Sequence, residues 1–129
     1  MDVRRTFWEK ATILHQMAHL PDEKPFPSRY SRHYSDVADM ISARVGEQAA
    51  VDDDLLAAVV KHKETFYRSA WAKYDTAHRG TLRLLPSENR ISDLGKDLAS
   101  MGEMFFGEPP DFDSMLKILR EWESNYNRV

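Results

Sequence analysis

The chain has no cysteine, no long apolar run and no strong excess of charge of either sign. The absence of cysteine among 129 residues excludes disulfides and thiolate metal sites. No stretch of about 18 apolar residues is present, so we expect no membrane span. Charged residues interrupt the first apolar segment, which argues against a secretory signal. Together these absences favour a cytoplasmic protein.

Several motifs of phosphate-handling and hydrolytic enzymes are also missing. The glycines form no phosphate-binding loop or dinucleotide fingerprint, and no serine stands in a Gly-x-Ser-x-Gly elbow. Nucleotidyl transfer needs metal-binding carboxylates held close together. The acidic run 52–54 follows no Gly-Ser turn, and acidic residues stabilise a helix start through its dipole. We therefore interpret this run as a helix start rather than a metal site.

The residues that are present fit one globular helical domain spanning 1–129. A hydrophobic fraction of 42% and a charged fraction of 30% suit a chain with one core and a solvated outer face. The net charge is −3, so any site for a polyanion must be a local basic patch.

Apolar residues recur at helical spacing in about five segments, and no convincing strand pattern is present. The expected helices cover residues 4–19, 31–45, 52–74, 87–105 and 112–126. Ser31 and Asp111 are expected to cap the starts of their helices, Ser87 to begin a helix, and Gly46 to end the second one. A loop is expected around Gly80. The sequence thus predicts an all-α bundle of about five helices.

One local region carries groups suited to binding phosphate. Lys10 lies in the first expected helix, Arg32 and His33 begin the second, and Asp36 follows one turn later. A helix start with free amides beside Arg and Lys is a ready anion site. We predict that Lys10, Arg32 and His33 bind phosphate. Asp36 could hold a metal, orient a cation or accept a hydroxyl proton; the alternative is an ordinary interhelix salt bridge with Lys10.

Other polar clusters favour structural roles. His15 and His19 share a helical face, but the glutamate of a helical zinc protease and a third ligand are missing, so we expect partly buried or surface histidines. His62, Lys63 and Arg68 could form a basic stripe that faces RNA, but we favour a solvated helix face.

A basic stretch from Lys73 to Arg83 lies close to Trp71 and Tyr74. Basic residues between aromatic ones suit single-stranded nucleic acid, because bases stack on rings while phosphates pair with cations. The same aromatic residues could belong to the core instead. We favour the core interpretation.

Longer strings of the chain resemble a known protein family. They are RTFWEKATILHQMAHLP, SRHYSDV, HKETFYRSAWAKYDTAHRGTLRLLP and MGEMFFGEPPDFDSMLKILREWE. Together they resemble the C-terminal half of the AbiEii/AbiGii nucleotidyltransferase toxins, over nearly all 129 residues.

This resemblance implies the toxin of a bacterial toxin–antitoxin pair that acts in abortive infection, a form of phage defence. Family members carry an N-terminal nucleotidyltransferase core with a Gly-Ser turn and a metal-binding acidic pair, followed by a helical part. The chain is similar to the helical part alone. We therefore expect the N-terminal catalytic core to be absent and the chain to be inactive by itself.

The resemblance also implies site residues and partners. Lys10 matches the lysine that contacts the nucleotide phosphates, and Asp36 matches the aspartate at the active-site edge, so both are expected to be catalytic. Arg32 and His33 lie in the motif of Asp36, in which Ser35 replaces an expected aromatic residue. The implied ligands are an NTP and an RNA such as tRNA.

The cognate antitoxin is the implied protein partner. Magnesium is expected only together with the catalytic core, and no metal is expected on this chain alone. A second hypothesis is a non-catalytic helical module that binds RNA or protein. A gene remnant that folds without any function is a third hypothesis.

Overall fold

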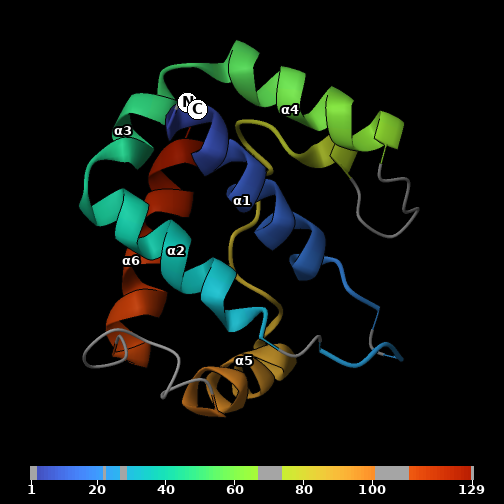
Figure 1. Ribbon diagram of the computed structural model, residues 1–129, viewed down its shortest axis with the longest axis vertical. Coiled ribbons are helices and arrows are strands. Elements are labelled where there is room, and N and C mark those ends of the chain that lie inside the picture. Colours follow the sequence, from blue (N-terminus) through green and yellow to red (C-terminus); the bar gives the residue numbers. More distant parts are fainter. Residues whose placement is uncertain (1–2, 22, 27–28, 67–73, 101–110, 129) are drawn as a thin grey trace.

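The computed structural model describes residues 3–21, 23–26, 29–66, 74–100 and 111–128. Within these ranges the chain forms helices and no strand, which confirms the all-α prediction (Figure 1). The α-helices are α1 (Val3–Ala18), α2 (Ser31–Ser42), α3 (Val45–Ala50), α4 (Asp53–Phe66), α5 (Glu88–Ser100) and α6 (Phe112–Asn127), with a 3-10 helix, η2, at Tyr74–Thr76. None of the described helices is long and apolar enough to cross a bilayer.

Helix α1 lies inside the bundle, where it contacts α2, α3 and α4 (Figure 1). Its apolar side chains recur every three to four residues and so form one buried stripe. Phe7, Trp8, Ala11 and Leu14 are fully buried. The expected helix over 4–19 is confirmed to within one residue at each end.

Aromatic rings fill the core between α1 and α6. Phe7 meets Trp122 edge to face at 5.1 Å between ring centroids, and Trp122 stacks on Tyr126 at 5.0 Å. Trp8 lies 5.2 Å from Tyr126. Each such pair stabilises the fold by about 0.5–1.5 kcal/mol beyond the burial of its area.

The prediction that Gly46 ends the second helix is wrong. Helix α2 already ends at Ser42, Arg44 adopts a left-handed backbone with φ of 69°, and Gly46 lies inside the short helix α3. A Cβ atom at Gly46 would lie 2.8 Å from Nε1 of Trp122. Glycine therefore permits the close approach of α3 to Trp122 rather than stopping a helix.

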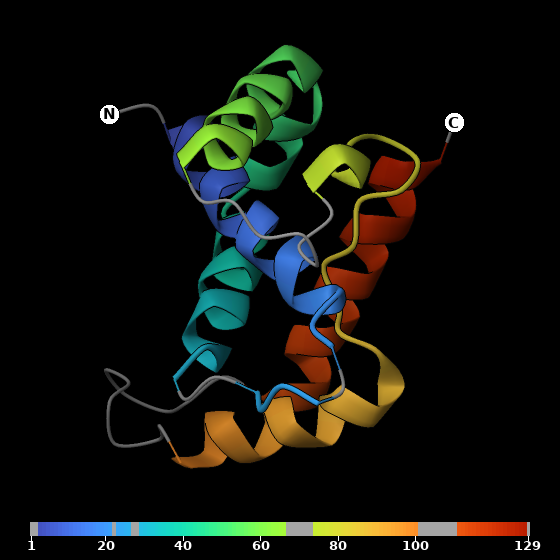
Figure 2. The ribbon, with the colours of Figure 1, turned by 90° about the vertical axis from the view of Figure 1, so that its right-hand side faces the viewer.

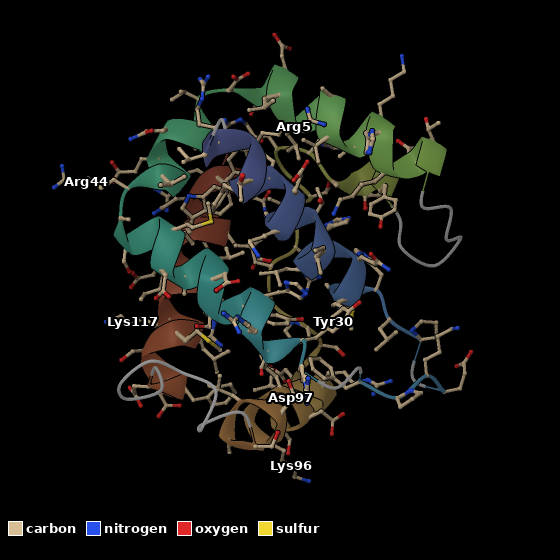
Figure 3. All side chains as sticks on the ribbon, viewed as in Figure 1. Arg5, Tyr30, Arg44, Lys96, Asp97 and Lys117 are labelled. Atoms are coloured by element: carbon tan, nitrogen blue, oxygen red, sulfur yellow. The ribbon has the colours of Figure 1, made fainter. Side chains whose placement is uncertain are left out.

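The prediction that Ser31 caps α2 is also wrong. The capping position belongs to Tyr30, which makes no side-chain bond there. Asp97 of α5 instead accepts hydrogen bonds from the amides of Arg29 (2.8 Å) and Ser31 (2.9 Å). Figure 3 shows Asp97 close to the beginning of α2. The cap thus comes from a residue distant in the sequence.

The other helix starts follow the sequence rules closely. The Asp52 carboxylate accepts from the Leu55 amide at 3.0 Å, so the acidic run does begin a helix. Asp111 accepts from the Ser114 amide at 3.2 Å and caps α6 as expected. Helix α5 begins at Glu88. The expected continuations through 67–73 and 101–105 lie outside the described residues.

The expected loop around Gly80 is confirmed; residues 78–81 lie mostly at the surface, and the residues that follow enter the core. Residues 78–81 form a turn, and the chain then runs on to residue 86 alongside α1 and α6 (Figure 2). Leu82 and Leu84 are fully buried. The segment therefore forms part of the core despite its lack of regular structure.

Candidate functional site

The structure brings Lys10 and Asp36 together. Lys10 Nζ on α1 lies 3.1 Å from Asp36 Oδ2 on α2, and the side chains are 29% and 33% exposed. An ion pair with this much solvent contact contributes at most about 1 kcal/mol to stability. The contact is the interhelix salt bridge that the sequence analysis gave as the alternative to a ligand site. Because both side chains are partly exposed, a ligand can still reach them.

A cavity of about 730 Å³ opens beside Lys10, between α1 and α4. Small-molecule sites in proteins have volumes of roughly 300–1,000 Å³. The lining side chains mix cationic, acidic, polar and apolar types: Thr6, Glu9, Lys10, Ile13, Gln16, Tyr30, Val59, His62, Lys63 and Tyr74. The cavity is large enough for a nucleotide.

His33 lies close enough to Lys10 and Asp36 to sense their charges. Burial is the main cause that lowers the pKa of His33, the positive charge of Lys10 lowers it further, and Asp36 opposes the shift. The ring packs edge to face on Tyr30 at 5.1 Å, and its Nδ1 is buried without a hydrogen-bond partner among the described residues. At neutral pH the ring is therefore neutral, so it can offer phosphate a hydrogen bond but no full charge.

The amides at the start of α2 are not free, in contrast to the prediction. The Ser31 amide donates to Asp97, and the amides of Arg32 and His33 donate to carbonyls of the preceding turn. The Asp97 carboxylate thus takes the place that a bound anion would occupy. Arg32 is exposed and does not line the cavity, so only its side chain is left to bind phosphate.

Lys63 is the site residue that sequence reasoning missed. It was expected on a solvated face, but it is only 9% exposed and lines the cavity. Its Nζ donates to the Glu9 carbonyl at 2.7 Å, and burial lowers the pKa of Lys63 to about 8. The sequence signal was its spacing: Lys63 continues the stripe of Leu56 and Val59 at helical intervals.

The two histidines at and just after the end of α1, His15 and His19, have structural roles. His15 is fully buried, which corrects the expectation of a partly buried or surface side chain. Its Nδ1 accepts from the Arg83 amide at 3.0 Å, and its Nε2 contacts Thr76 Oγ1 at 2.9 Å. His19 Nδ1 donates to the His15 carbonyl. Among the described residues no group of three or more histidines and carboxylates could hold a metal.

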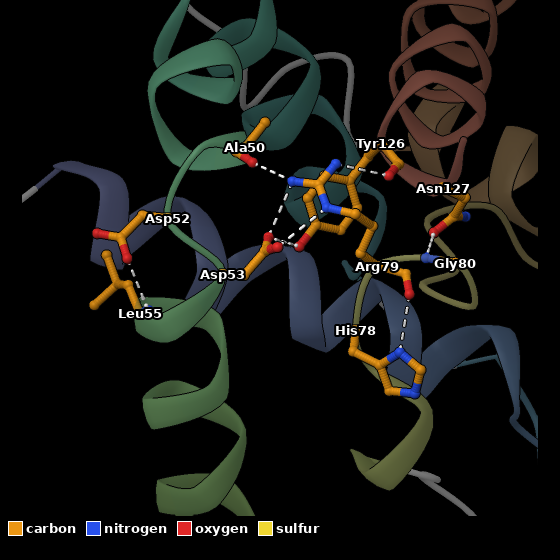
Figure 4. A network of polar contacts seen from close by, with 9 residues as sticks. All are labelled: Ala50, Asp52, Asp53, Leu55, His78, Arg79, Gly80, Tyr126 and Asn127. Atoms are coloured by element: carbon orange, nitrogen blue, oxygen red, sulfur yellow. Dashed lines mark hydrogen bonds and ion pairs between the residues drawn. The ribbon is translucent and has the colours of Figure 1, made fainter. Parts of the chain in front are cut away.

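The basic stretch of the sequence contains a second polar cluster (Figure 4). Arg79 binds the Asp53 carboxylate through Nε (3.1 Å) and Nη2 (3.0 Å), and also donates to the carbonyls of Ala50 and Tyr126. Its guanidinium lies 4.3 Å over the Tyr126 ring, whose hydroxyl donates to Asp53 at 2.7 Å. The hydrogen bond from Arg79 lowers the pKa of Asp53.

This cluster ties α4 to α6, so Arg79 has a structural role. Tyr74 is buried, which confirms the core interpretation for that residue. Trp71 and Lys73 lie outside the described residues.

Comparison with known proteins agrees with the family resemblance of the sequence motifs. The model of one family, described as nucleotidyl transferase AbiEii toxin of type IV toxin–antitoxin systems, matches residues 1–118. Neither the curated proteins nor the solved structures give a match. Because the matched residues cover most of the chain, it belongs to the AbiEii nucleotidyltransferase toxin family.

Proposed function

We propose that this chain is the helical C-terminal part of a nucleotidyltransferase toxin and that it binds the NTP through Lys10 and Asp36. The observation that carries this proposal is the 3.1 Å contact between the two side chains at the edge of a nucleotide-sized cavity. Membership of the AbiEii family supplies the reaction class.

Lys10 fits the charge changes of nucleotidyl transfer. A hydroxyl of the acceptor attacks the α-phosphorus, the bond to pyrophosphate breaks, and the hydroxyl loses its proton. An ammonium group stabilises the negative charge that builds up on the phosphates. Asp36 holds Lys10 Nζ in position through their ion pair. Arg32 and His33 add a side-chain charge and a neutral hydrogen-bonding group close by.

Magnesium does not fit the described residues by themselves. Its sites usually offer carboxylates together with substrate phosphates. Asp36 brings a single carboxylate, which already binds Lys10, and the described ranges hold no larger acidic cluster. The acidic pair that binds magnesium would belong to a catalytic core, and without that core the chain is proposed to be inactive.

The family also supports the proposed partners and setting. A type IV toxin–antitoxin system includes an antitoxin, which is the expected protein partner. We place the chain in the cytoplasm and in defence by abortive infection, with RNA such as tRNA as the acceptor of the nucleotide. The absence of cysteine suits a reducing compartment.

Calorimetric titration of the chain with magnesium and each of the four NTPs tests this proposal. We expect binding at micromolar to millimolar strength, weakened at least about tenfold by Lys10→Ala, which removes the charge that acts on the phosphates, and also weakened by Asp36→Ala, which removes the partner that positions Lys10 Nζ. Lys117→Ala, at an exposed position of α6, is the matched control. Circular dichroism checks that the helices are retained.

Two outcomes would contradict the proposal. Folded Lys10→Ala and Asp36→Ala variants with unchanged affinity would remove the site assignment. A wild-type chain that binds no NTP would instead favour the non-catalytic module that binds RNA or protein.

A further inference from the structure

We propose that Lys63 is a second phosphate-binding cation, which acts from the α4 wall of the cavity while Lys10 acts from the α1 wall. The cavity would then bind the polyphosphate chain of the ligand between two helices. This inference rests on the proposed function, because both use the same cavity.

The environment of Lys63 is unusual for a lysine. Its side chain is nearly buried, beside Val59 in the lining of the cavity. A buried ammonium group is destabilised unless it is paired and fully hydrogen-bonded. Nζ carries three donors, and the Glu9 carbonyl takes one of them. In the described part of the chain, no carboxylate forms an ion pair with Lys63.

The nearby carboxylates of the described residues bind other cations and do not neutralise Lys63 by direct contact. From α1, the Glu9 carboxylate binds Arg5 at 3.2 Å, and Lys10 is paired with Asp36. Glu9 therefore offers Lys63 its carbonyl oxygen and only a weaker charge effect at longer range.

The remaining titratable neighbours provide no negative charge at neutral pH. His33 of α2 is neutral at neutral pH, and the Lys63 charge is one of the causes that lower its pKa. The pKa of Tyr74 in η2 is raised by burial, so its phenol is neutral, and His62 and Tyr30 also line the cavity. A ligand with several negative charges would supply the counter-charge that Lys63 lacks.

Phosphate suits this arrangement better than a single carboxylate would. Lysine binds phosphate as a point charge, and two lysines on opposite walls can act on different phosphate groups of one chain. Inorganic tripolyphosphate is a suitable probe, because it has no base or ribose and reports on phosphate binding alone.

Titration calorimetry at about pH 8 tests the proposal, since Lys63 is then partly neutral. Tripolyphosphate should bind the wild-type chain, and Lys63→Met should weaken binding at least about tenfold. Lys117→Met is the control and should bind as the wild type does. Repeating the titration in buffers of different ionisation enthalpy should show more proton uptake in the wild type than in Lys63→Met, since the protonation of tripolyphosphate itself contributes to both.

A measurement without any mutation keeps the test independent of folding. The ¹³Cε chemical shift of Lys63, followed against pH, should give a pKa of about 8 in the free chain. With tripolyphosphate bound, the pKa should move toward the ordinary value for lysine. An unchanged pKa in the complex would overturn the proposal.

The variants separate this inference from the proposed function. If Lys10→Met loses binding while Lys63→Met binds like the wild type, Lys63 has no role and the Lys10 assignment stands. The reverse result supports Lys63 and removes Lys10. A wild-type chain that does not bind tripolyphosphate at millimolar concentration overturns the phosphate site altogether.

Discussion

Lys63 places a charged group on the buried face of α4, where the other buried side chains are apolar. Its aliphatic stem packs in the lining of the cavity, and its ammonium group reaches a backbone carbonyl of α1. Burial favours the neutral form and lowers the pKa to about 8. Lys63 therefore binds its proton less tightly in the folded state than in the unfolded chain.

This difference predicts how stability responds to pH. Between about pH 8 and 10.5 the unfolded chain binds more protons at Lys63, so the free energy of unfolding should rise with pH in that window. Relative to Lys63→Met, the gain should be on the order of 1–2 kcal/mol, allowing for partial solvent contact. Urea denaturation of both proteins at several pH values measures it.

The comparison with Lys63→Met also removes the effect of other groups. The pKa values of Tyr34, Tyr74 and Tyr126 are raised, but these side chains are present in both proteins. A difference in stability that stays constant from neutral to alkaline pH would show that Lys63 titrates normally.

Single residues were predictable where a local motif defined them. The sequence motifs around Lys10 and Asp36 predicted that the two side chains lie in one region, and they do form an ion pair. The motifs do not distinguish a salt bridge from a ligand site. Lys63 was missed because a lysine is usually solvated, and its burial depends on α1 packing across it. His15 was misjudged because its partner, the Arg83 amide, lies 68 residues away.

At the scale of elements, helix α2 shows the limits of local rules. Ser31 is the residue type that normally caps a helix, yet the cap comes from Asp97 on α5. Helix α3 was missed for a similar reason, since Gly46 was judged by its propensity rather than by the Trp122 ring beside it. The helix types followed from periodicity; their ends depended on contacts between elements.

The cap predicts a graded loss of stability. Asp97→Ala should destabilise the fold by about 0.5–2 kcal/mol, because the amides of Arg29 and Ser31 lose their acceptor. Asp97→Asn should cost less, since it keeps one oxygen that can accept. Lys96→Ala, at an exposed neighbouring position, is the control. Urea denaturation that gives Asp97→Asn a larger loss than Asp97→Ala would contradict this assignment.

For the molecule as a whole, the segment 77–86 joins the two ends of the described chain. The Arg83 amide donates to His15 of α1, and the Leu84 amide donates to Glu123 of α6 at 2.7 Å. Asn127 accepts from the Gly80 amide at 3.0 Å. Sequence patterns predicted a loop here and an all-α fold, but they carry no information on which side chains serve the backbone of the loop.

These bonds predict slow hydrogen exchange in an irregular segment. In the wild type, the amides of Gly80, Arg83 and Leu84 should be protected like those of the core helices. Asn127→Ala should speed exchange at Gly80 at least about tenfold and affect Arg83 less, because Arg83 has a different acceptor. Amide exchange followed by NMR measures each site.

Asn125→Ala, at an exposed position of α6, is the matched control and should leave the exchange of Gly80 unchanged. Wild-type amides in 80–84 that exchange as fast as those of an open loop would contradict the structure of the segment.

The same segment sets the order in which the domain can be completed during translation. Its acceptors lie on α1, which precedes the segment in the chain, and on α6, which the ribosome makes after it. Until α6 has been made, the Gly80 and Leu84 amides lack their partners, and Trp8 lacks the rings of Trp122 and Tyr126. A nascent chain halted before α6 therefore lacks the packing contacts between α1 and α6. Helix α1, which carries Lys10, is then less firmly held. All the residues that line the cavity beside Lys10 are thus made before α6, but the packing that holds α1 in place is completed only with α6.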